Sequence, residues 1–181
     1  MDVSSAPATL EPGQQAQMLV TVACTGAFSL QALSSLSVSY HLSDAQRVAV
    51  TLQLPALATK FLVPAPAVEN AQFYSAWRAL SGPPNKLEKV LQVKPGLAAR
   101  GLAGWQALLG ALRLHVTPGV DPNALNIFAA SSLCTPAGPL CIVRIESDAR
   151  NAAQFRVTVA SADATLAASV RDVLLQAADA V

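Results

Sequence analysis

The first third of the chain alternates between apolar and polar residues, which is the pattern of strands with one face in a core. The alternation is blurred over residues 18–24, where Leu19 interrupts it, and clear over residues 36–42 and 48–54. Ser43-Asp44-Ala45-Gln46 lies between the two clear segments and is typical of a turn, so a β-hairpin is predicted. Half-polar alternation of this kind indicates antiparallel sheet with one buried face, as in a β-sandwich.

A proline-rich connector follows these strands. It contains Pro55, Pro64 and Pro66. Because proline interrupts both helices and sheets, the connector predicts a domain boundary near residue 60. The first domain, residues 1–60, would be β-rich, and the second, residues 61–181, would combine helices and strands.

Helical periodicity begins after the connector. Residues 70–81 have aromatic and aliphatic side chains at helical spacing, with Asn70 suited to the start and Gly82 to the end. A second short helix is predicted over residues 84–93, because apolar residues recur there three and four positions apart and Pro84 suits a first turn.

The last 85 residues continue to mix helix and strand. Residues 97–114 are rich in Ala and Leu, which favour helix, but alternation near their end predicts a strand in the second half. Three more strands are predicted over residues 124–133, 140–146 and 155–160, followed by an amphipathic helix that starts near Asp163. The fold class is therefore α+β.

Composition narrows the functional classes. A hydrophobic fraction of 52% supplies a core, and 12 basic against 11 acidic residues leave a net charge of +1. Without a dense basic run, neither nucleic-acid binding nor a polybasic membrane patch is expected. The N-terminus lacks the pattern of a signal peptide, and no window reaches the ~18 apolar residues of a membrane span, so no membrane insertion is expected.

The residues most often used in catalysis and metal binding form no recognisable motif. Cys24, Cys134 and Cys141 share no metal spacing and predict reduced, packed thiols in a cytosolic protein. His41 and His115 lie in different halves and are expected to face solvent. Nucleophile-elbow, phosphate-loop, dinucleotide and zinc-helix patterns do not occur in the sequence, so neither an enzyme nor a cofactor is expected.

One group of polar residues does suggest a surface for binding. Arg144 and Glu146 are two apart and share a strand face, as do Arg156 and Thr158 on the next predicted strand. If these strands are antiparallel neighbours, two guanidiniums and a carboxylate cluster. With Trp77 nearby, the cluster would suit a peptide that carries an aromatic anchor and an acidic residue. The alternative is a surface ion pair beside a Trp77 that fills the core.

Four segments then follow one another in the order and spacing of a known family. Phe73-Tyr74-Ser75-Ala76-Trp77-Arg78-Ala79-Leu80-Ser81 is similar to its Phe-Phe-x-x-Trp-x-x-Leu-Ser helix. Residues 120–128 resemble the family's Val-Asp-Pro-Asn stretch and the strand after it. Residues 140–146 resemble its Cys-Leu-Leu-Arg-Leu-Glu strand, and residues 155–159 resemble its Tyr-Arg-Leu-Thr-Leu strand. The chain thus resembles the C-terminal appendage, or ear, of α-adaptin in the plasma-membrane clathrin adaptor complex.

The resemblance implies a partial immunoglobulin-like β-sandwich over residues 1–60 and a platform over residues 61–181, with an antiparallel sheet flanked by helices. It implies that the platform binds Asp-Pro-Phe, Asp-Pro-Trp and Phe-x-Asp-x-Phe motifs of endocytic accessory proteins, without a cofactor. The motif-binding residues that it implies are Trp77, Tyr74, Arg144, Glu146 and Arg156.

The resemblance also implies a cellular setting. The protein would be cytoplasmic and peripheral at clathrin-coated pits of the plasma membrane. Its parent chain would contact the other adaptor subunits and the clathrin coat.

The sequence departs from the family pattern in three ways. Ala160 stands where the animal proteins have a second Arg after Arg156, Tyr74 replaces a Phe, and only about three sandwich strands precede the platform. Two alternatives therefore stay open: an appendage of the same architecture from a β-adaptin or a coatomer γ-like subunit, or a purely structural domain.

Overall fold

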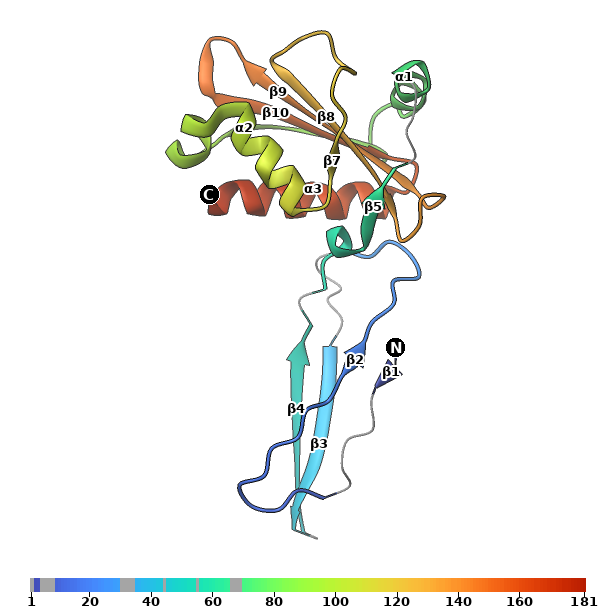
Figure 1. The fold of residues 1–181 in the computed structure, drawn as a ribbon, viewed down its shortest axis with the longest axis vertical. Helices are drawn as coiled ribbons and strands as arrows, with labels where there is room; N and C mark the ends of the chain where they lie inside the picture. Colours follow the sequence, from blue (N-terminus) through green and yellow to red (C-terminus); the bar gives the residue numbers. More distant parts are fainter. Residues whose placement is uncertain (1, 4–8, 30–34, 44, 55, 66–69) are drawn as a thin grey trace.

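A six-stranded antiparallel sheet is the largest element of the computed structural model, which describes residues 2–3, 9–29, 35–43, 45–54, 56–65 and 70–181 (Figure 1). The strand order is β5-β8-β9-β10-β6, and β7 also pairs with β8. The bounds are β5 Leu62–Pro64, β6 Lys86–Gln92, β7 His115–Val116, β8 Asn126–Leu133, β9 Leu140–Asp148 and β10 Asn151–Ser161. The three strands predicted after residue 120 are confirmed as β8, β9 and β10.

Helices lie on both faces of this sheet. Helices α2 (Pro95–Ala111) and α3 (Ala164–Ala180) pack on one face, whereas α1 (Asn70–Ala79) packs on the other. Helix α3 begins as predicted, because the Asp163 carboxylate accepts hydrogen bonds from the backbone N–H groups of Thr165 and Leu166 at 2.9 and 3.1 Å. These features confirm the α+β class.

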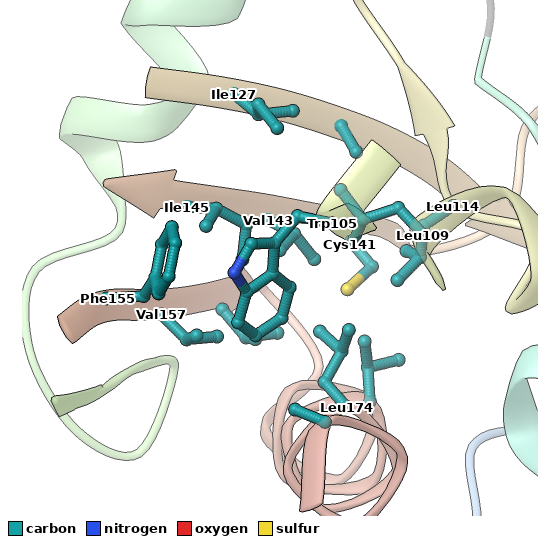
Figure 2. Packing of buried hydrophobic residues seen from close by; sticks show 14 of the residues in the cluster. Trp105, Leu109, Leu114, Ile127, Cys141, Val143, Ile145, Phe155, Val157 and Leu174 are labelled. Carbon is teal, nitrogen blue, oxygen red and sulfur yellow. The ribbon is translucent and has the colours of Figure 1, made fainter. Parts of the chain in front are cut away.

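The main core lies between the sheet and helices α2 and α3 (Figure 2). Trp105 of α2 is fully buried at its centre, with its ring centroid 5.6 Å from that of Phe155 on β10. The strands contribute Ile127, Val143, Ile145, Phe155, Val157 and Val159, and α3 contributes Leu166, Val170 and Leu174. One face of every central strand is therefore buried in the apolar core.

The N-terminal third is built from small sheets. Strand β1 (Asp2–Val3) pairs with β2 (Val20–Thr21). Within the strand predicted over residues 18–24, only these two residues of β2 are extended in a sheet. Strands β3 (Ser35–Ser43) and β4 (Gln46–Gln53) form the predicted hairpin, with Leu36 opposite Leu52. The hairpin extends away from the six-stranded sheet in Figure 1, and Leu52 is exposed. Asp44, Pro55 and Pro66 lie outside the described residues.

A short segment before the hairpin contacts the large sheet. The Phe28 and Phe61 rings meet edge to face at 6.1 Å, next to the 3₁₀ turn Ala58–Phe61. The Ser169 hydroxyl of α3 donates a hydrogen bond to the Phe28 carbonyl, and the Cys134 thiol donates one to the Cys24 carbonyl at 3.3 Å. Residues 24–28 thus connect the two parts of the chain.

Two secondary-structure predictions are wrong. The helix predicted over residues 84–93 is the edge strand β6, which pairs with β10. Leu87 and Leu91 led to the error, because residues four apart share a face in a strand as well as in a helix. The strand predicted in the second half of residues 97–114 is also wrong, since α2 continues to Ala111 and only His115–Val116 is extended.

The cysteines and histidines have no common site. All three cysteines are free. Burial in the core raises the pKa of the Cys141 thiol to about 12, and desolvation raises that of Cys134 to about 11. His41 and His115 are both exposed. Among the described residues, no cluster of three or more His, Cys, Asp or Glu could hold a metal ion, and no described helix could span a membrane.

Trp105→Ala is expected to lower the free energy of unfolding by about 3–5 kcal/mol, because it opens a cavity in the centre of the core. The exposed neighbour on the same helix, Gln106→Ala, should change it by less than about 0.5 kcal/mol. Urea denaturation followed by circular dichroism measures both. Equal stability of the two variants would contradict the packing described here.

Candidate functional site

The face of the sheet that carries α1 is polar over much of its area, and we call it the polar face. Arg144 and Glu146 of β9 and Arg156 of β10 point to it, because their neighbours Val143, Ile145 and Val157 are buried on the other face. Strands β9 and β10 are antiparallel, with Arg156 paired to Glu146 and Thr158 to Arg144. This pairing brings the predicted guanidiniums and carboxylate together.

The register continues across four strands and arranges the polar face in three rows. From β8 to β6, the rows are Asn126–Glu146–Arg156–Val90, Phe128–Arg144–Thr158–Glu88 and Ala130–Ile142–Ala160–Lys86. The first two rows mix charges of both signs. In the third row, Lys86 is the only charged residue. The other three members are buried and apolar, and Ala160 contributes only a methyl group.

The charged residues form a chain of ion pairs. Arg144 lies 2.9 Å from Asp121 and 3.0 Å from Glu146, and its side chain is 26% exposed. Arg156 lies 3.3 Å from Glu88 and 3.9 Å from Glu146, and its side chain is 52% exposed. Arg144 therefore lies toward the more buried end of the chain of ion pairs, and Arg156 lies toward the end that is open to solvent.

Asp121 holds Arg144 from a loop outside the sheet. Its carboxylate accepts hydrogen bonds from the backbone N–H of Asn123 at 2.9 Å and from the side-chain amide of Asn126 at 2.8 Å. Desolvation raises the pKa of this carboxyl, but these hydrogen bonds and the Arg144 guanidinium outweigh it, and the pKa is below its ordinary value. Asp121 is thus ionised and fixes both the loop and the guanidinium.

An aromatic cluster borders the ion pairs. The Phe73 ring of α1 is buried and contacts Phe128 of β8 at 4.9 Å between ring centroids. Tyr74 packs on Phe128 at 6.3 Å, and its hydroxyl donates a hydrogen bond to the Val120 carbonyl at 2.5 Å. The hydroxyl that distinguishes Tyr74 from phenylalanine therefore ties α1 to the loop before Asp121.

Trp77 is the partly open member of the cluster. Its ring meets that of Phe128 edge to face at 5.4 Å and remains half-buried, whereas Trp105 is fully buried. The Lys86 ammonium lies 3.8 Å from the centroid of the Trp77 ring and donates a hydrogen bond to the Trp77 carbonyl at 3.3 Å. A cation held over indole in this way is stabilised by the ring quadrupole.

The structure brings the five predicted residues onto one surface. Trp77 and Tyr74 come from α1, and Arg144, Glu146 and Arg156 come from β9 and β10. Phe128 connects the two groups, since the Arg144 guanidinium lies 5.3 Å from its ring centroid.

Four further residues that the sequence pattern does not predict also belong to this surface: Asp121, Phe128, Lys86 and Glu88. Lys86 and Glu88 were missed because residues 84–93 were predicted to be a helix. Once that segment is a strand, the spacing of two between them places both on one face.

A shallow hollow of ≈ 200 Å³ lies at the open end of the ion pairs. Its lining comes from β6, β9 and β10: Val90, Glu146, Ser147, Asp148, Gln154 and Arg156. Such a depression suits one side chain of an extended ligand better than a whole small molecule, which needs a deeper and mostly apolar pocket.

Asp121→Asn is expected to lower the free energy of unfolding at pH 7 by about 1–2 kcal/mol, because it removes the charge that pairs with the half-buried Arg144. The folded-state pKa lies below the ordinary 3.8, so the carboxylate stabilises the fold above that pH and loses its effect as the pH falls through the folded value. The difference between wild type and variant should therefore be full at pH 7 and shrink below pH 3.8 in urea titrations.

The matched control is Asp172→Asn, which removes the partner of Arg171. The Asp172 side chain is 36% exposed against 10% for Asp121, so the effect should be small at either pH. A wild-type advantage over Asp121→Asn that stayed constant down to pH 3 would contradict this role of Asp121.

Several known proteins are similar to this chain. Residues 60–178 match the family described as Alpha adaptin AP2, C-terminal domain. The chain is 32% identical over 174 residues to the AP-2 complex subunits alpha-2 and alpha-1 of Arabidopsis thaliana, covering 95% of this chain and 16% of each relative. It is 27% identical over 171 residues to AP-2 complex subunit alpha-2 of Dictyostelium discoideum, covering 92% of this chain and 16% of that relative.

The chain therefore spans about a sixth of the length of these relatives. The family match covers well over half of the chain and includes the whole six-stranded sheet, α1, α2 and all but the last two residues of α3. This chain belongs to the α-adaptin C-terminal domain family.

Proposed function

We propose that this chain is a clathrin-adaptor appendage whose polar face binds short linear motifs that combine an aromatic and an acidic residue. The observation that carries the proposal is the half-buried Trp77, which lies beside Phe128 and Lys86, with the Arg144 guanidinium over the Phe128 ring. An aromatic anchor and a carboxylate could both find partners within this small area. The motifs in question are Asp-Pro-Phe, Asp-Pro-Trp and Phe-x-Asp-x-Phe.

The aromatic side of the motif would contact Trp77. Tryptophan is enriched among residues that dominate binding energies, because it buries a large area and loses little conformational freedom. Phe73 and Phe128 hold the inner side of the Trp77 site, so its position is set before a ligand arrives. Tyr74 would act mainly by holding α1, through its bond to the Val120 carbonyl.

The acidic side of the motif would meet a surface that already carries both signs of charge. Glu146 forms ion pairs with both Arg144 and Arg156, which keeps the two guanidiniums oriented. Such an arrangement favours ligands that bring one or two carboxylates and repels longer acidic runs. A short peptide buries less than ~1,200 Å², so micromolar affinity is expected, with avidity from repeated motifs.

The wider role is part of the same proposal. The relatives are subunits of AP-2 complexes, so the parent protein would act in clathrin-mediated endocytosis and vesicle transport, peripheral to the membrane and in contact with other adaptor subunits. We also place the boundary between the β-rich part and the platform near residue 60, where the family match begins.

The two alternatives have less support. The family match favours an α subunit over a β-adaptin or a coatomer γ-like subunit. A purely structural domain would be expected to bury both tryptophans. In this chain Trp105 is buried, but Trp77 remains partly exposed.

The experiment is calorimetric titration of the 181-residue chain with a Phe-x-Asp-x-Phe peptide, alongside Trp77→Ala. The variant should lose about 2 kcal/mol or more of binding free energy, roughly a 30-fold loss of affinity, because it removes the aromatic anchor site. Arg78→Ala is the matched control, since Arg78 is the exposed neighbour on the same helix and should leave the affinity unchanged.

Thermal unfolding of both variants confirms that the titrations compare folded proteins. Unchanged affinity in folded Trp77→Ala, or no heat from the wild type with this peptide and with an Asp-Pro-Trp peptide, would overturn the proposal.

A further inference from the structure

We infer that Lys86, rather than Arg144 or Arg156, is the principal partner of the ligand carboxylate on the polar face. The inference rests on the proposed function and assigns the residue that reads the acidic position of the motif. The sequence pattern predicts a helix at Lys86 and gives this residue no part in a motif. Its role follows from the pairing of charges, the sheet register and the contact with Trp77.

The pairing of charges distinguishes Lys86 from its neighbours. Arg144 already has two carboxylate partners, Asp121 and Glu146, and Arg156 has Glu88 and Glu146. Among the described residues, no carboxylate lies within 4.0 Å of the Lys86 ammonium, which contacts the Trp77 ring and the Trp77 carbonyl. A ligand carboxylate can therefore pair with Lys86 without displacing an ion pair of the protein.

The register explains why this charge comes from β6. In the row Ala130–Ile142–Ala160–Lys86, the other three side chains are apolar and buried. Ala160 lies directly opposite Lys86 and extends no further than its methyl group, so the long Lys86 side chain can turn toward α1. The edge strand thereby supplies the only cation in this row, and its ammonium reaches the Trp77 ring.

The surroundings of Lys86 also favour an incoming anion. Desolvation lowers the pKa of the Lys86 ammonium, and the nearby Arg144 charge lowers it further, against a smaller effect of Glu88. The ammonium has thus lost part of its hydration and is repelled by a neighbouring guanidinium. A carboxylate bound beside the ammonium compensates for both the lost hydration and the repulsion. An exposed and fully hydrated lysine carries neither penalty, so it would gain less from the same carboxylate.

The contact with Trp77 constrains the ligand. Because the ammonium lies 3.8 Å from the ring centroid, a carboxylate that pairs with Lys86 must lie next to the indole. The aromatic anchor of the same ligand then has to use the remaining open surface of Trp77. The acidic and aromatic residues must therefore be close together in the peptide, and a peptide that separates them widely should bind poorly.

The test is a double-mutant cycle measured by calorimetry on the 181-residue chain. The protein is wild type or Lys86→Met, which keeps an unbranched apolar stem over Trp77 but removes the charge. The ligand is a Phe-x-Asp-x-Phe peptide or the same peptide with Asn in place of Asp.

Lys86→Met should weaken binding of the Asp peptide about tenfold and leave that of the Asn peptide unchanged. Lys86→Arg, which keeps the charge, should retain the preference for Asp. Lys89→Met is the matched control, because Lys89 is an exposed lysine of the same strand, three residues from Lys86, and so points to the opposite face. It should change neither affinity.

Equal losses for both peptides would overturn the inference, because Lys86 would then only support Trp77. Tighter binding of both peptides would also overturn it, since Lys86 would then merely cover the ring. In either case wild-type binding that is lost in Trp77→Ala leaves the proposed function intact. Absence of wild-type binding to any of the peptides would overturn the function and the inference together.

Discussion

The pairing of β10 with β9 on one side and with β6 on the other is the constraint on which the rest of the structure depends. This register sets Val157 and Val159 against the dry core and leaves Arg156 and Thr158 on the opposite face. A shift of one residue would exchange the faces, burying a guanidinium and exposing the valines. Packing of α2 and α3 on the opposite face therefore determines which charges reach the polar face.

The two faces make unequal contributions to stability and function. The face under α2 and α3 is apolar and densely packed around Trp105, so burial there supplies most of the favourable free energy. The ion pairs on the polar face are partly exposed, and pairs of this kind contribute only about 0–1 kcal/mol each. These ion pairs therefore add little to the stability of the fold, and Asp121 is the exception because it fixes a loop.

Much of the fold could be predicted from the sequence because the relevant patterns are local. The alternation over residues 140–146 and 155–160 predicts which side chains share a face, and Asp163 predicts the start of α3. The edge strand β6 could not be predicted, because Leu87 and Leu91 fit a helix as well as a strand, and only pairing with β10 distinguishes the two. The same error concealed Lys86 and Glu88. Phe128 and Asp121 were missed because their contacts join segments far apart in sequence.

The most direct test of the central claim, that the polar face is the docking surface, is nuclear magnetic resonance of the ¹⁵N-labelled chain titrated with a Phe-x-Asp-x-Phe peptide. The chain has two indole N–H signals, from a half-buried Trp77 and a fully buried Trp105, which serves as an internal control. Docking on the polar face predicts that the Trp77 signal and the backbone signals of Lys86, Arg144 and Arg156 shift with peptide concentration while the Trp105 signal stays in place. Shifts confined to the β3–β4 hairpin, or to the Trp105 side of the sheet, would contradict it.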